Sequence, residues 1–472
     1  MKCQRYITTT LPYVNADPHL GFALEIVQAD ALARFWRILG HEVFFNTGTD
    51  EYGQKIEGRS REEGRDIQEY VEAHARAFKA LKEKLNLSYD NFLRTTLPEH
   101  AKAAQEMWRR CNEKGDIYKK KYKGKYCVGD EMFVRESDLI EGKCPNHPNM
   151  ELQEIEEENY FFKFSNYREA LLEYLTRDGV IIPEWRRKEA VAFVEDGLEN
   201  FSISRERERM SWGISVPDDE TQVMYVWFDA LTNYISTLGW PDDKNGNFKK
   251  FWEEGYIVQT AGKDQVRFQS LMWQAMLFSA GVKNTDMVFY HGFITSKGQK
   301  MSKSLGNVIS PDELVARYGT DATRYLLLRH VHPFEDTDIT HERLDEWYTA
   351  NLVNGLGNVV ARIMKMSQEH LNQYSGVNSR EEIHMLDEFN FQKAMDSLWS
   401  RIQALDEKIT ATEPFKLIKD EPEKAKELIR ELGTELLFIG RALEPFMPET
   451  AKKIHDAVVA NKKPENLFPR LN

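Results

Sequence analysis

The stretch that decides the fold is RYITTTLPYVNADPHLGF, residues 5–22. Its first half is β-branched and aromatic, which is typical of a buried strand, and Pro12 lies near the end of that strand. A polar turn follows, and a helix opens at His19–Leu20–Gly21. The amide groups at a helix N-terminus attract anions, so the turn indicates an anion site. Phe22, at the end of the stretch, offers no side-chain hydrogen-bond donor to such a site.

The segments that follow alternate between helix and strand. Apolar residues recur at helical spacing over 20–39, and Gly40 ends that helix. EVFFNTGTD (42–50) has the pattern of a second strand, and a long helical stretch is expected over roughly 60–85. This βαβ order predicts a parallel sheet that binds ligands at the carboxyl ends of its strands.

The pattern of the sequence changes three times along the chain. It becomes rich in short strands and aromatics after Gly115, returns to alternating strands and helices near 223, and loses its strand signals from about 349. We therefore expect an α/β protein with a Rossmann-like parallel-sheet domain split by a connective insertion and followed by an all-α bundle. The expected parts are 1–115 and 223–290 (the two halves of the sheet domain), 116–222 (the insertion), 291–348, and 349–472 (the bundle).

Composition narrows the class of protein. The 472 residues are 41% hydrophobic and 29% charged, without a membrane-length apolar run or a signal-peptide core, so we expect a folded cytosolic protein. Four cysteines argue against a disulfide framework. The chain stops at Asn472 without an appended dimerisation module, which predicts a monomer.

The net charge of −13 argues against a protein coated by nucleic acid, but it leaves room for an RNA partner that local patches contact. One such patch is KKKYKGKY (119–126), in which tyrosines interrupt a run of lysines. Taken alone, this patch fits a solvated loop or edge strand as well as it fits RNA contact.

The most specific stretch is GFITSKGQKMSKSLGN (292–307). Mobile lysines beside small residues suit a loop that closes over a triphosphate, and Lys300 and Lys303 flank Met301 and Ser302 in this way. An arbitrary K-x-x-K would indicate only a basic surface loop. KMSKS downstream of HLG, however, resembles the paired motifs of class I aminoacyl-tRNA synthetases.

Within that class the chain is similar to the methionyl-tRNA synthetase family. The segments that carry the resemblance occur in order: YITTTLPYVNADPHLG, FFNTGTDEYGQKI, YVWFDALTNYI, AGKD, FYHGFITSKGQKMSKSLGNV, LGNVVAR and ATEPFKL. The resemblance implies an ATP-dependent ligase that forms methionyl-adenylate and transfers methionine to the 3′ end of tRNA(Met). It also implies that 291–348 contacts the tRNA stem and that 349–472 binds the anticodon.

Two alternatives stay open. The first is an inactive paralogue that binds tRNA or an amino acid, although such a protein would have no reason to keep all these motifs together. The second is a cysteinyl-tRNA synthetase, which would need a cysteine-rich zinc site in the amino-acid pocket. No cysteine lies near the pocket motifs.

The resemblance also implies the roles of individual residues. His19, Lys300 and Lys303 would be catalytic. ATP, with Mg²⁺, would bind at His19, Gly21, Gly262, Lys263, Asp264, His291, Gly292 and Lys303. Asp50 would hold the ammonium of L-methionine, and the rest of that pocket would be Leu11, Tyr13, Trp227, Leu231, Tyr234 and Gln269. Without the family match, the helical face of Trp227, Leu231 and Tyr234 would be read as ordinary core.

Two further sites follow from the resemblance. Relatives carry a zinc knuckle with C-x-x-C and C-x-x-H pairs, and the corresponding ligands here are Cys127, Asp130, Cys144 and His147. A carboxylate is a legitimate zinc ligand, so bound Zn²⁺ and a metal-free knuckle both remain possible. In the helical domain Asn358, Arg362 and Phe415 would read the anticodon, as single-stranded RNA loops are commonly read.

Five positions depart from the family pattern: Phe22, Tyr52, Gln269, Asp130 and Phe415. Gln269 replaces a pocket histidine and Phe415 a stacking tryptophan, and Gln269 and Tyr52 both keep hydrogen-bonding ability. Phe22 is the serious departure, because losing one preorganised donor near the transferring phosphate costs about 10²–10³ in rate.

Overall fold

The computed structural model describes residues 3–129, 132–134, 136–145, 147–300, 308–372 and 389–471. The chain forms two compact units, each assembled from segments that are far apart in the sequence. The first unit comprises Met1–Asp17, His41–Ala80 and Tyr89–His291. The second comprises Pro18–Gly40, Leu81–Ser88 and Gly292–Asn472.

A six-stranded parallel sheet organises the first unit. Its spatial order is β3-β2-β1-β12-β13-β7, and every adjacent pair is parallel. The strands are β1 (Gln4–Thr8), β2 (Glu42–Thr49), β3 (Asn91–Arg94), β7 (Ile181–Ile182), β12 (Tyr256–Gly262) and β13 (Met287–His291). The predicted parallel α/β sheet is confirmed.

The direction of strand addition reverses between β1 and β12. From β1 the chain adds β2 and β3 on one side, whereas β12 leads to β13 on the other. Open α/β sheets bind ligands in the crevice at such a switch point, beyond the carboxyl ends of the strands. The sheet topology alone therefore directs attention to the residues that follow β1 and β12.

Helices and a large apolar core surround this sheet within the first unit. The helices are α2 (Gln54–Glu62), α3 (Ile67–Lys84), α4 (Pro98–Glu113), α5 (Arg168–Leu175), α6 (Glu184–Asp196), α7 (Val226–Leu231), α8 (Asn233–Ser236) and α9 (Trp273–Ala280). The helical stretch expected over roughly 60–85 contains the end of α2 and the whole of α3, which a short turn separates. Gly64 lies in the turn between them with φ +63°, a conformation that glycine adopts readily.

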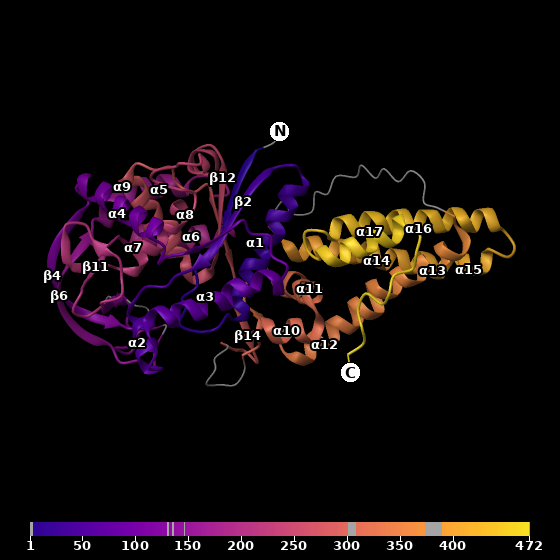
Figure 1. The fold of residues 1–472 in the computed structure, drawn as a ribbon, viewed down its shortest axis with the longest axis horizontal. Coiled ribbons are helices and arrows are strands. Elements are labelled where there is room, and N and C mark those ends of the chain that lie inside the picture. Colours follow the sequence, from indigo (N-terminus) through magenta and orange to yellow (C-terminus); the bar gives the residue numbers. More distant parts are fainter. Residues whose placement is uncertain are drawn as a thin grey trace. The chain divides into compact units, whose positions relative to one another are not determined.

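The insertion is built on a long antiparallel ribbon of β4 (Ile117–Cys127) and β6 (Gln153–Phe162), which run side by side in Figure 1. A four-stranded sheet, β5-β4-β6-β8, forms around the ribbon with β5 (Met132–Val134) and β8 (Phe201–Ser202). A three-stranded sheet contains β9 (Ser204–Glu206), β10 (Ser215–Val216) and β11 (Asp219–Met224). KKKYKGKY lies in β4, where residues 119–124 pair with β6 alone and only Lys125 and Tyr126 also pair with β5, so most of the run has the single strand neighbour of an edge strand among the residues described.

In the second unit a buried arginine joins distant segments. Arg324 on α11 (Thr320–His330) is fully buried and lies 2.8 Å from Asp30 on α1 (Leu20–Ile38). Its guanidinium also donates to the carbonyl oxygens of Leu85, Pro445 and Phe446. Such a fully paired buried arginine holds these segments in one arrangement, because removing a partner would leave an uncompensated charge.

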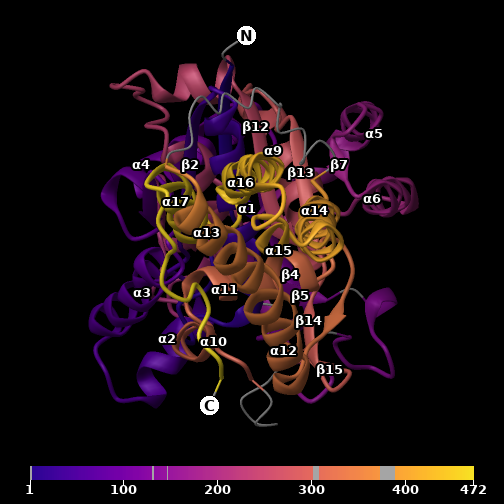
Figure 2. The same cartoon turned by 90° about the vertical axis from the view of Figure 1, so that its right-hand side faces the viewer.

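The rest of the second unit is mostly helical. Helices α13, α14, α16 and α17 pack side by side (Figure 2). The elements are α10 (Pro311–Tyr318), α12 (His341–Trp347), α13 (Asn358–His370), α14 (Phe391–Thr412), α15 (Pro414–Leu417), α16 (Pro422–Leu443) and α17 (Pro448–Val459). A small sheet contains β14 (Ile294–Ser296), β15 (Gln299–Lys300) and β16 (Thr337–Asp338). No helix in the described part of the chain is long and apolar enough to cross a membrane.

Candidate active site

The candidate residues of the first unit lie just beyond the carboxyl ends of its strands. Asp50 follows β2, and backbone hydrogen bonds hold it to residues 9–14, the segment after β1 that we call the extension of β1. Asp50 N donates to Pro12 O (3.0 Å), and Val14 N donates to Asp50 O (3.2 Å). Gly262, the last residue of β12, is in register with His291, the last residue of β13. The structure thus gathers these residues at one edge of the sheet.

An aromatic wall lies beside the extension of β1. The rings of Tyr13 and Trp227 meet edge to face with centroids 6.4 Å apart. Trp227 also stacks on Phe268, with ring centroids 3.8 Å apart and an angle of 13° between the ring planes. Phe268 was missed by sequence reasoning, although it directly precedes the candidate Gln269. Leu11 is half-buried on the same strand extension.

The sequence predicts that Trp227, Leu231 and Tyr234 share one face of a helix. In the structure two short helices, α7 and α8, carry these residues. Leu231 ends α7 and Tyr234 lies in α8, and both side chains are buried in the same apolar cluster. The Gln269 side-chain amide donates a hydrogen bond to the Tyr234 hydroxyl. The structure therefore brings Tyr13, Trp227, Tyr234 and Gln269 together through a continuous chain of contacts.

Buried carboxyl groups lie close to this wall. Asp50 is only 4% exposed, and the Thr95 hydroxyl donates to its Oδ1 at 3.4 Å. Burial raises the pKa of Tyr52 well above its usual value, and the charges of Asp229, Glu51 and Asp50 raise it further. Tyr52 therefore keeps its proton to a higher pH than an ordinary tyrosine and is a hydrogen-bond donor in an acidic neighbourhood.

Glu51 fixes the loop that carries Asp50. It is fully buried; Oε1 accepts from Thr49 (2.7 Å) and from Arg94 (2.7 Å), and Oε2 accepts from Arg94 (3.0 Å). The Glu51 amide donates to the Thr95 hydroxyl at 2.9 Å. With both carboxylate oxygens paired, Glu51 acts as an internal anchor for the loop rather than as a ligand for a cation.

The insertion contributes one more anchor, which sequence reasoning missed. The Trp212 indole N–H donates to Glu51 O at 2.6 Å, and the Trp212 ring lies 5.3 Å from the Tyr52 ring. Next to it, the Ser211 hydroxyl donates to Glu57 on α2 at 2.8 Å. The sequence offered no signal for this contact, because Trp212 and Glu51 are 161 positions apart.

In the second unit His19 caps the N-terminus of α1. Its Nδ1 accepts from the Phe22 amide at 3.2 Å, so the proton of a neutral ring resides on Nε2. A Cβ at position 21 would lie 3.1 Å from the His19 ring, a tight contact that glycine avoids. The Phe22 side chain is only 5% exposed.

The lysine loop is described only in part. Thr295 and Lys300 pair across the β14–β15 hairpin, whose two-residue turn, Lys297–Gly298, has positive φ at both positions, as a tight hairpin turn requires. The neighbouring Gly292 is required by close packing, because a Cβ there would meet Glu335 C at 2.1 Å. Lys303 lies outside the described residues.

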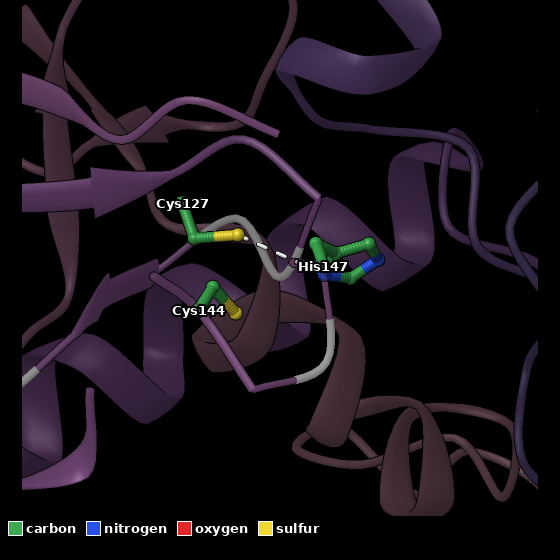
Figure 3. Close-up of side chains that lie close together, drawn as sticks. All are labelled: Cys127, Cys144 and His147. Carbon is green, nitrogen blue, oxygen red and sulfur yellow. Dashed lines mark hydrogen bonds between the residues drawn. The ribbon is translucent and has the colours of Figure 1, made fainter. Parts of the chain in front are cut away.

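Three of the four expected zinc ligands cluster in the insertion (Figure 3). The ligand atoms of Cys127, Cys144 and His147 all lie within 4.8 Å of one another, and Cys127 Sγ is 3.7 Å from His147 Nδ1. Bonds of about 2.3 Å to sulfur and 2.0 Å to nitrogen in a tetrahedral zinc site allow such a separation. Both cysteines are free thiols, so the donor set fits zinc. Asp130 lies outside the described residues.

The expected anticodon residues are accessible to different degrees. Asn358 is exposed at the start of α13, and Arg362 follows one turn later and forms an ion pair with Asp406. Phe415 in α15 is 45% exposed, which is unusual for a large apolar side chain. An exposed ring of this kind is available for stacking.

Comparisons with known proteins agree with this geometry. A family model described as "tRNA synthetases class I (M)" matches residues 5–157 and 149–364. A methionine–tRNA ligase from Caldanaerobacter subterraneus subsp. tengcongensis is 39% identical over 97% of this chain and 74% of its own length. One from Thermosynechococcus vestitus is 44% identical over 77% of this chain and 69% of its own length. A solved Mycobacterium tuberculosis methionyl-tRNA synthetase in complex with methionyl-adenylate matches with a TM-score of 0.89 at 33% identity, covering 100% of this chain and 98% of the other.

Proposed function

We infer how the chain works from its family: it belongs to the methionine–tRNA ligases, a group of class I tRNA synthetases. It is a ligase that uses ATP to activate methionine and joins it to tRNA. The observation that carries this conclusion is the match over the whole chain to a structure bound to methionyl-adenylate. The match favours this function over an inactive paralogue and over a cysteinyl enzyme.

The deciding experiment is methionine-dependent exchange of pyrophosphate into ATP by the purified protein. Exchange with methionine, and none with cysteine, is the expected result. An inactive paralogue would bind methionine or tRNA without exchange, so binding measured alongside the exchange separates the two functions.

Individual roles within the site are proposals. Asp50 binds the methionine ammonium, and Leu11, Tyr13, Trp227, Leu231, Tyr234 and Gln269 surround the side chain. The thioether suits this environment, because sulfur makes favourable contacts with aromatic rings. Gly262, Lys263, Asp264, His291 and Gly292 hold the adenosine side of ATP. His19, Gly21, Lys300 and Lys303 stabilise the phosphates, and Mg²⁺ accompanies ATP.

We propose the tRNA contacts from the resemblance to the same family. Asn358, Arg362 and Phe415 read the anticodon, and 291–348 approaches the tRNA stem. The five-part division of the chain, a cytosolic location and a monomeric state remain predictions. Size-exclusion chromatography with light scattering tests the last of these.

We further propose that the knuckle binds one Zn²⁺ through Cys127, Cys144 and His147, with Asp130 as the fourth ligand. Zinc at this position would hold the turn after β4 to the segment 144–147, which is a structural role. Elemental analysis should find about one zinc per chain. Cys144→Ser should lose the metal and lower the melting temperature, whereas Cys3→Ser, at an exposed thiol, should change neither. A zinc-free wild type with the same melting temperature as Cys144→Ser would refute the site.

Trp212→Phe should raise the KM for methionine about tenfold, because an unsatisfied buried carbonyl costs about 1–3 kcal/mol and the freed Glu51 carbonyl precedes Tyr52 in the Asp50 loop. The KM for ATP should stay within twofold of the wild-type value. Trp185→Phe is the matched control, since that tryptophan is 46% exposed on α6. Equal changes in both Michaelis constants would show a general loss of folding instead of a positioning role.

A further inference from the structure

The backbone of the insertion positions the two cysteines of the knuckle. Cys127 is the last residue of β4 and is in register with Met132 on β5. Cys144 directly follows a tight turn, in which the backbones of Ile140 and Lys143 exchange two hydrogen bonds of 3.0 Å. Each cysteine is therefore attached to a segment that its own backbone pairing holds in place.

The two sulfur atoms are close enough to be joined. Cys127 is 0% exposed and Cys144 is 1% exposed. Their Sγ atoms lie within 4.8 Å of each other, as Figure 3 shows. A disulfide requires an S–S distance of about 2 Å, so movement of the two side chains closes the gap without refolding either segment.

The cluster is accessible from the side of His147. A Cβ at Gly129 would lie 2.5 Å from His147 Cγ, so the turn after β4 admits the His147 ring because residue 129 has no side chain. His147 is partly exposed, whereas both cysteines are buried. A small neutral oxidant such as hydrogen peroxide can therefore reach the two sulfurs past the His147 ring.

The other two cysteines of the chain belong to other elements. Cys3 is exposed and directly precedes β1. Cys111 is buried in α4, and burial raises the pKa of its thiol to about 12. Since the thiolate is the reactive form, Cys111 is inert near neutral pH. Cys127 and Cys144 are thus the pair that an oxidant can join.

We propose that Cys127 and Cys144 form a reversible disulfide when a peroxide oxidises the knuckle, and that this bond replaces the metal as the link between their segments. One sulfur attacks the peroxide, the O–O bond breaks, and a sulfenic acid forms with release of one water. The second sulfur displaces the sulfenic oxygen as another water, and the S–S bond forms. Two electrons pass from the sulfurs to the peroxide, and the two thiol protons complete the two waters.

Oxidation and metal binding exclude each other at this pair. Zinc is bound by thiolates, and neither sulfur of a disulfide is a thiolate. The disulfide leaves His147 as the one remaining donor among the three described ligands. It closes the same loop, 127–144, that a bound metal would close, so the two segments stay connected. The proposal is independent of the ligase activity.

The first test adds hydrogen peroxide to the purified zinc-loaded protein. It should release about one zinc per chain, which a chromogenic chelator measures. Peptide mapping without reductant should find the Cys127 peptide joined to the Cys144 peptide, and a thiol reductant should separate them and restore zinc binding. Zinc release without this cross-link would overturn the proposal, as would a disulfide that contains Cys3 or Cys111. A protein isolated without zinc should still form the cross-link, so failure of the zinc site is distinguishable.

The second test asks whether the disulfide replaces the metal link, and it needs no variant. Metal-free wild type should melt about 2–4 °C higher after oxidation than in its reduced form, because the disulfide constrains the unfolded chain. Cys3→Ser is the control and should show the same rise, whereas Cys127→Ser should show none. Equal melting temperatures of oxidised and reduced metal-free wild type would refute the replacement of the metal link.

Discussion

Asp50→Asn should lower kcat/KM for methionine about 10²–10³-fold, because truncating one member of a buried charge pair costs about 2–5 kcal/mol. Asp50 is 4% exposed, so water screens its charge weakly, and its backbone is held to the β1 extension on both sides. The isosteric amide keeps the shape of the side chain and removes the charge. Pyrophosphate exchange at varied methionine and saturating ATP measures the loss.

A ligand that lacks the ammonium separates charge recognition from a general defect in the pocket. The desamino analogue of methionine should bind Asp50→Asn and wild type with similar affinity, since it offers no cation to the carboxylate. Asp229→Asn is the informative comparison, because Asp229 is also fully buried and its charge also acts on Tyr52. A large loss in Asp229→Asn with little change in Asp50→Asn would transfer the ammonium site to Asp229.

Four strands of the sheet, β1, β2, β12 and β13, were predictable because they are apolar runs separated by helical periodicity, whereas the short strands β3 and β7 at the two edges of the sheet were not predicted. The residues at the strand ends were predictable for the same reason, since Asp50 directly follows β2 and Gly262 ends β12. The break between α2 and α3 was not predictable from the sequence. Gly64 lies in a polar sequence whose helical pattern continues on both sides, and its positive φ is a property of the folded turn.

The contacts that the sequence concealed are those between distant segments. Trp212 reaches Glu51 from the insertion, and Gln269 reaches Tyr234 across 35 positions. Arg205 has the sequence pattern of an ordinary strand cation, and only packing shows that it is buried without a carboxylate among the residues described. Motif spacing identifies residues that contact a ligand, whereas residues that position them are found only from tertiary contacts.

The N-terminus of α1 shows how the proposed phosphate site can work with Phe22. The first amides of a helix have no acceptor within the helix, and here the Phe22 amide is satisfied by His19 Nδ1. This bond directs the ring proton to Nε2, so His19 is a donor on the side away from the cap. The Phe22 side chain is buried and offers no donor of its own. An anion at this helix end would therefore meet the Leu20 and Gly21 amides and the Nε2–H side of the His19 ring.

His19→Ala should slow the formation of methionyl-adenylate about 10²–10³-fold, the usual cost of removing one preorganised donor to a transition-state charge. His19→Asn separates the two roles of this residue, because asparagine is a strong N-cap but is too short to replace Nε2. It should recover most of the helix stability lost in His19→Ala and little of the rate. Stopped-flow measurement of adenylate formation at saturating methionine gives the rate, and thermal melting gives the stability. Recovery of the rate by His19→Asn would show that His19 acts by capping α1 and that the backbone amides alone stabilise the phosphate.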